Sequence, residues 1–171
     1  MSRFFAISFS FLATVLIVLA AGPTEKDVRE YLDQYLGAWR GEVSVENSSG
    51  EVIRTFPLAA EYWKSGDVLK GLTAFEVGGE MTFIESENYF RNGLLFADVT
   101  QQGETVTYRG YLREESLDWV PYDVDLNTER LMKEWFSEEN GETILRVVGE
   151  ELLHSDKGTG KVILKAKMIR Q

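Results

Sequence analysis

The chain of 171 residues contains no cysteine. Without thiols no disulfide can staple the fold, and attachment of a lipid through a cysteine is excluded. Stability must therefore come from burial of a hydrophobic core. The length allows this, because about 150 residues remain after the first apolar segment, the usual size of one domain. We expect one domain.

Basic residues are scarce. The chain has 18 Lys and Arg residues and 28 Asp and Glu residues, so its formal net charge is −10. Nucleic acids and anionic membrane surfaces are bound through basic patches that displace counterions. The charge therefore argues against nucleic acid and membrane surfaces as partners, and its simplest role is solubility. A protein partner is left unknown.

The sequence also lacks a nucleophile box, a phosphate-binding loop and a cluster of metal ligands, so we predict no metal and no cofactor. The single histidine, His154, stands two residues before Asp156, which could orient it as a general base. A lone histidine beside a turn is more often solvated. Glu85 and Glu87 share a strand face and could form an acid and base pair, although solvated carboxylates explain them more simply.

Two other polar patterns have simple structural explanations. Residues 123–129 place oxygen ligands at alternate positions, as a calcium loop does, but the glycine needed for the sharp bend is missing. Asn47-Ser48-Ser49 fits the glycosylation pattern, and it fits a polar hairpin turn equally well. We therefore interpret residues 123–129 as a long loop or an exposed strand edge, and Asn47-Ser48-Ser49 as a hairpin turn.

Only one long apolar run is present. It covers residues 4–21 and follows Arg3, which is the arrangement of an export signal. Cleavage after Ala20 would divide the chain into a signal peptide, residues 1–20, and a mature domain, residues 21–171. The alternative is an uncleaved anchor. We expect a periplasmic or secreted protein without a membrane attachment after cleavage.

Residues 24–36 form the first element that we predict, a short amphipathic helix. Apolar side chains recur there every three or four residues, and charged side chains fill the other face. Thr24 and Asp27 have the spacing of an N-terminal cap, and Gly37 can leave helical dihedral angles at the end.

Residues 38–171 change to alternating, β-branched and aromatic runs, broken at nine places by turn residues. Nine breaks predict about ten strands. Asn92-Gly93 is the clearest hairpin, because these residues tolerate the positive φ angles of a type I′ turn. Strands without intervening helices pair antiparallel with their neighbours.

An open sheet of ten strands would leave two unprotected edges. We therefore predict an all-β fold, an antiparallel up-and-down β-barrel with the helix closing one end; a two-sheet sandwich is the alternative. Alternation points Trp39 and Val43 to one face and Tyr108 inward. For residues 94–101 and 143–153 both faces carry apolar residues, so the inner face is left open.

Gly37-Ala38-Trp39 resembles the Gly-x-Trp opening of a lipocalin's first strand, and the chain is similar in pattern to the calycin superfamily. The resemblance implies that Arg170, on the last strand, packs across Trp39 and fixes the closure of first strand against last. The missing disulfides and the missing Thr-Asp-Tyr motif point toward the bacterial lipocalin-like barrels of largely unassigned function. Haem-binding barrels of the nitrobindin kind have a glycine-rich opening that this chain lacks, so we assign no haem ligand.

Aromatic residues occur in nearly every strand, and a barrel of about ten strands is wide enough to keep a cavity. We predict a non-catalytic protein that binds a small hydrophobic molecule. The alternatives are a filled barrel that serves as a protein-interaction scaffold in the envelope, and an enzyme that uses the barrel mouth. The predicted wall residues are Tyr62, Phe75, Tyr89, Tyr108, Trp119 and Trp135.

Overall fold

The computed structural model describes residues 22–122, 131–155 and 158–171. The apolar segment 1–20, the calcium-like pattern 123–129 and Asp156 lie outside the described residues. Within the described ranges, no helix has the length and hydrophobicity needed to cross a membrane.

The helix α1 (Glu25–Asp33) begins with a capping box. The Thr24 hydroxyl accepts a hydrogen bond from the Asp27 backbone N–H at 3.3 Å, and the Asp27 carboxylate accepts one from the Thr24 backbone N–H at 2.7 Å. The helix ends three residues before the predicted position. The next three N–H groups, Gln34 to Leu36, donate to carbonyls three residues back, which tightens the chain before Gly37 turns away at φ 109°.

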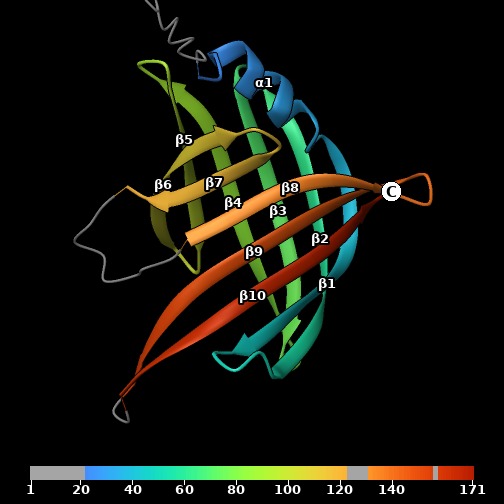
Figure 1. The fold of residues 1–171 in the computed structure, drawn as a ribbon, viewed down its shortest axis with the longest axis vertical. Helices are drawn as coiled ribbons and strands as arrows, with labels where there is room; N and C mark the ends of the chain where they lie inside the picture. Colours follow the sequence, from blue (N-terminus) through green and yellow to red (C-terminus); the bar gives the residue numbers. More distant parts are fainter. Residues whose placement is uncertain (1–21, 123–130, 156–157) are drawn as a thin grey trace, which may run out of the picture.

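Ten antiparallel strands follow and form a closed barrel (Figure 1), which confirms the predicted fold class and rules out the sandwich. Each strand pairs with its neighbours in the chain, and β1 pairs with β10. The strands are β1 (Gly37–Asn47), β2 (Val52–Ser65), β3 (Val68–Val77), β4 (Glu80–Arg91), β5 (Leu94–Gln101), β6 (Glu104–Arg113), β7 (Ser116–Pro121), β8 (Leu131–Glu139), β9 (Glu142–Ser155) and β10 (Gly158–Arg170).

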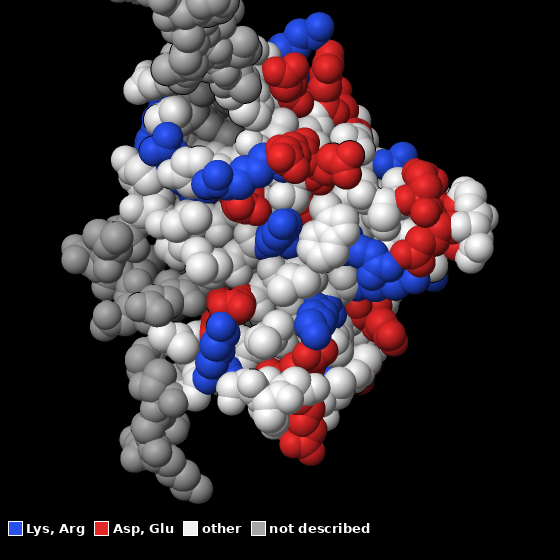
Figure 2. Space-filling view, viewed as in Figure 1, with Lys and Arg blue, Asp and Glu red and all other residues white. Residues whose placement is uncertain are grey.

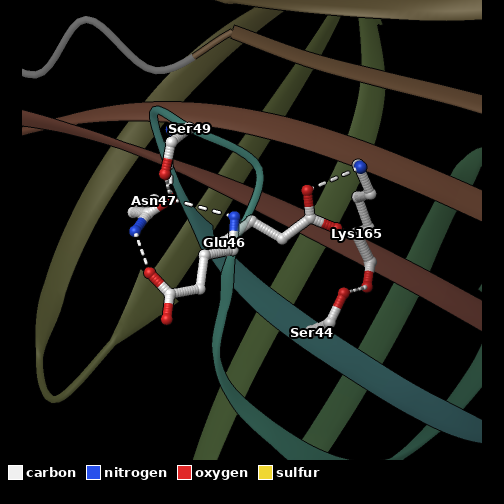
Figure 3. A network of polar contacts seen from close by, with 6 residues as sticks. Ser44, Glu46, Asn47, Ser49 and Lys165 are labelled. Atoms are coloured by element: carbon white, nitrogen blue, oxygen red, sulfur yellow. Dashed lines mark hydrogen bonds and ion pairs between the residues drawn. The ribbon is translucent and has the colours of Figure 1, made fainter.

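The hairpins whose turn residues are described form at predicted turn residues. Asn92 and Gly93 have φ angles of 54° and 74°, as a type I′ turn requires. In the β1–β2 hairpin the Asn47 side-chain oxygen accepts hydrogen bonds from the backbone N–H groups of Ser49 and Glu51, each at 3.0 Å (Figure 3). Asn47 therefore builds the turn, which supports the hairpin interpretation of this motif.

The seam between the first and last strands closes the barrel. Trp39 is fully buried and pairs with Arg170 across the seam, where the guanidinium carbon lies 4.8 Å from the centre of the indole. This is the contact that the lipocalin resemblance implies. The Trp39 indole N–H donates to the Tyr35 carbonyl at 2.6 Å, and Arg170 donates to the Gln34 carbonyl. The seam is thereby tied to the chain that leaves α1.

α1 lies across one end of the barrel (Figure 1) and adds its apolar face to the core. Val28, Tyr31 and Leu32 of the helix are buried together with Trp39 and Leu145 of the strands. The Tyr31 hydroxyl donates to the Glu134 carbonyl of β8 at 3.1 Å. This end is therefore closed by packed side chains.

Acidic and basic side chains alternate on the outer surface of β10 and its neighbours (Figure 2). The Lys165 ammonium lies 2.7 Å from the Glu46 carboxylate of β1 (Figure 3), and the Lys167 ammonium lies 2.7 Å from the Glu139 carboxylate of β8. Glu46 is buried, whereas the Lys167–Glu139 pair is exposed, and exposed pairs each contribute little to stability. On this face Glu46 and Glu139 are therefore each paired with a lysine of β10.

Candidate ligand-binding site

A cavity of about 420 Å³ lies inside the barrel, between the chain at the end of α1 and the inward-facing side chains of the strands. Its wall is largely apolar. Leu32 and Tyr35 contribute from the helix end, and aliphatic side chains from most strands complete the lining. The aromatic residues that line it are Tyr35, Phe56, Tyr62, Phe75, Tyr108 and Trp119.

Four of the six predicted wall residues lie where the sequence placed them. Tyr62, Phe75, Tyr108 and Trp119 come from β2, β3, β6 and β7 and all line the cavity. Tyr108 lines the cavity, so its predicted inward direction is correct. Contact of these four residues with a ligand stays a prediction.

Tyr89 and Trp135, the other two predicted wall residues, do not line this cavity, and their contact with a ligand stays a prediction. Successive side chains of a strand point to opposite faces. Asn88 faces inward in β4, so its neighbour Tyr89 faces outward; Glu134 faces inward in β8, so Trp135 faces outward. Trp135 instead lines a groove at β7, β8 and β9.

An aromatic cluster on the outer surface explains why the faces of β5 could not be distinguished in the sequence. Phe96 is only 2% exposed although it points outward. It stacks on Tyr89 with ring centres 6.0 Å apart and meets Tyr122 edge-on at 5.2 Å, and the Arg91 guanidinium carbon lies 4.4 Å from its centre. Ala97, Val99 and Gln101 of this strand line the cavity.

Glu134 of β8 is an acidic group on the inner surface. The Tyr35 hydroxyl donates a hydrogen bond to its Oε2 at 2.5 Å, and the Trp119 indole is a second hydrogen-bond partner. Glu134 lines the cavity and is partly accessible there. Burial raises the pKa of the Glu134 carboxyl, against the opposing effect of the hydrogen bonds from Tyr35 and Trp119.

The aromatic rings around Glu134 are packed against one another. Tyr35 lies 5.4 Å from Tyr62 and 4.8 Å from Phe136, both in edge-on geometry. Burial raises the pKa of the Tyr35 and Tyr62 hydroxyls, and the nearby Glu134 carboxylate raises it further. Both tyrosines therefore stay protonated and can act as hydrogen-bond donors across the ordinary pH range.

The remaining polar groups are dispersed along the cavity. The Asn88 side-chain N–H₂ donates to the Leu69 carbonyl at 3.1 Å, which holds the amide in place. Among the described residues that line the cavity there is no lysine or arginine. The polar lining residues beyond the tyrosines include Thr73, Ser86, Asn88, Gln101, Glu134 and Glu151.

The two glutamates that the sequence offered as an acid and base pair do not line this cavity. Glu85 and Glu87 are exposed on the outer face, and the Glu87 carboxylate lies 2.7 Å from the Lys70 ammonium. His154 lies in β9, where its backbone pairs with Thr159. No group of three or more potential metal-ligating side chains occurs among residues 22–122, 131–155 and 158–171.

Solved structures share this architecture. A protein of unknown function from the DUF3598 family of Nostoc punctiforme is similar over 82% of this chain, with 15% sequence identity and a TM-score of 0.57. The chain spans about half the length of that protein, 49%. The S-type phycobiliprotein lyase CPES from Guillardia theta is similar over 84% of this chain and 92% of its own, with 8% identity and a TM-score of 0.51.

No protein-family model matches the sequence, and no curated protein matches it. At these identities the likeness to solved structures shows the fold alone. It is consistent with the calycin-like barrel that the sequence resembles.

Sequence reasoning missed Glu134 and the role of Tyr35. A signal for Glu134 was present, because it alternates with Met132 and Phe136, which places a carboxylate on an apolar strand face. Tyr35 falls on the apolar face of the helix predicted over residues 24–36, and only the fold shows that its hydroxyl reaches a strand about one hundred residues later in the chain.

Proposed function

We propose that the protein is an exported, non-catalytic barrel that binds a small, largely apolar molecule in its interior. One observation carries the proposal: the barrel holds a cavity of about 420 Å³, lined by aromatic and aliphatic side chains with a few placed polar groups. This volume and composition are typical of small-molecule sites, which are mostly apolar with polar groups that orient the ligand.

The proposal of export rests on the apolar segment that follows Arg3 and on the small residues Val18 and Ala20 at the expected cleavage site. Binding without catalysis is favoured because the lining is largely apolar and its polar groups are dispersed, with the Tyr35 hydroxyl held by its hydrogen bond to Glu134. A neighbour named as a phycobiliprotein lyase adds a bilin to the ligands to be tested first.

A cavity-filling variant tests the proposal. Ala166 of β10 lines the cavity, whereas Ala59 of β2 is exposed on the outside. A panel containing a long-chain alcohol, a long-chain amine, a retinoid and a bilin would be titrated into the protein, with the fluorescence of Trp119 and the other tryptophans as readout.

We expect at least one panel member to bind, and Ala166→Phe to weaken that binding at least about tenfold, because the new ring occupies ligand space. Ala59→Phe should bind like the unmodified protein. The proposal is contradicted when no panel member binds, or when Ala166→Phe binds as tightly as the unmodified protein.

A further inference from the structure

The charged side chains among the described residues that line the cavity are acidic. Glu134, Glu150 and Glu151 line it, Glu150 is paired with Lys161 of β10, and the described lining residues include no lysine or arginine. An apolar molecule that ends in a carboxylate or a phosphate would therefore meet the like charge of Glu134 in a site of low dielectric, and no lysine or arginine of the described lining could pair with it. The lining opposes anionic lipids.

Glu134 has unused capacity to accept hydrogen bonds. An ionised carboxylate offers about four acceptor positions. The Tyr35 hydroxyl and the Trp119 indole occupy two of them. Because Glu134 also lines the cavity, the remaining positions are available to a donor that enters the barrel.

The surroundings of Glu134 suit a positive group in two ways. A buried carboxylate without a cation is costly, and this cost is why burial raises the pKa of Glu134. A cation placed beside it would relieve the cost and add its own attraction. The rings of Tyr35, Tyr62 and Trp119 line the same cavity and offer π faces, which attract cations.

From this lining we infer that the ligand is an apolar molecule carrying a protonated amine, and that Glu134 receives the ammonium group at the helix-closed end of the cavity. This inference rests on the proposed binding function and names its ligand class. The apolar part of the molecule then lies along the barrel toward Phe56 and Phe75, whose stacked rings, 5.4 Å apart, line β2 and β3.

Three probes with the same chain test the inference: dodecylamine, dodecanol and dodecanoate, each below its critical micelle concentration. Titrations at physiological ionic strength weaken the attraction of the negative outer surface for the amine. They would be made on the unmodified protein, on Glu134→Gln, and on Glu142→Gln as a control, since Glu142 is exposed in the β8–β9 hairpin. Thermal unfolding without ligand verifies that each variant is folded.

We expect the amine to bind the unmodified protein at least about tenfold more tightly than the alcohol, and dodecanoate to bind most weakly. In Glu134→Gln the amine should lose this advantage while the alcohol binds as before. In Glu142→Gln the preference should persist.

The inference is overturned when dodecanoate binds as tightly as the amine, or when Glu134→Gln keeps the amine preference. In either case alcohol binding would leave the proposed function intact. Absence of binding by all three probes, together with failure of the wider panel, would overturn the proposed function and this inference with it.

Discussion

Glu134 departs from the rule that charged side chains are usually exposed to water. Its neighbours two positions away, Met132 and Phe136, are apolar and point into the barrel, so the carboxyl is carried inside with them. Tyr35 and Trp119 satisfy part of its hydrogen-bonding capacity, but neither brings a positive charge. Such a buried acid lowers stability, and proteins keep these groups at functional sites.

Replacement of Glu134 by Gln should therefore stabilise the ligand-free protein in a pH-dependent way. Because the pKa of Glu134 is raised on folding above its ordinary value of 4.5, the folded state binds the proton more tightly than the unfolded state. The stability of the unmodified protein then falls as pH rises from 4.5 through the folded pKa.

Glu134→Gln does not lose stability in this way. The difference in free energy of unfolding between the variant and the unmodified protein should therefore be smallest at acid pH and grow toward neutral pH. Its slope is up to about 1.4 kcal/mol per pH unit between the unfolded and folded pKa values of the carboxyl. Urea unfolding over this pH range measures it, with Glu142→Gln as the control. A difference that shrinks as pH rises would contradict the expected sign.

At the scale of elements, the pairing of β1 with β10 depends on the close approach of two backbones. A Cβ added to Gly41 of β1 would lie 1.8 Å from the carbonyl oxygen of Lys167 in β10. Backbone cannot move aside as a flexible side chain can. Gly41 therefore allows the two strands to come together next to Trp39 and Arg170.

We expect Gly41→Ala to lower the free energy of unfolding by about 1–3 kcal/mol or more, because one of the two strands must shift. Gly160→Ala is the matched control: Gly160 lies in β10, and an added Cβ there meets no atom within 4 Å. Chemical denaturation of both variants measures the effect. Equal stability of the two variants would show that the seam tolerates the added methyl group.

Hairpin positions were the most predictable elements, because the signal is local. Asn92-Gly93 and the Asn47 turn are set by residues adjacent in the chain, whose φ preferences and side-chain hydrogen bonds do not depend on the rest of the fold. The inner face of β5 was not predictable. Phe96 is buried on the outside by Arg91 and Tyr122, and that cover exists only after the strands have paired.

For the molecule as a whole, ten strands in a closed ring leave no edge available for pairing within the described barrel, and the helix covers one end. The barrel begins at residue 37 and α1 at residue 25, so every described contact lies beyond the proposed cleavage site. The described elements that form the cavity therefore all lie within the proposed mature chain, residues 21–171.

If the protein is exported as proposed, expression in a bacterial host should yield a periplasmic or secreted form whose first residue is Ala21. N-terminal sequencing of the fractionated protein tests this expectation. Replacing Val18 and Ala20 by leucine should block cleavage, since the peptidase requires small side chains at these positions. A protein recovered in the cytoplasm with its first residues intact would contradict export.

The sequence by itself determined the strand number, the antiparallel order, the capped helix and the inward direction of Tyr108, because turn chemistry and alternation are properties of neighbouring residues. Only the tertiary structure decided that Tyr89 and Trp135 face outward, that Glu134 lies beside Tyr35 and Trp119, and that the interior keeps a cavity. These features depend on which distant strands meet and in what register, and the burial of each side chain is defined only when the barrel closes.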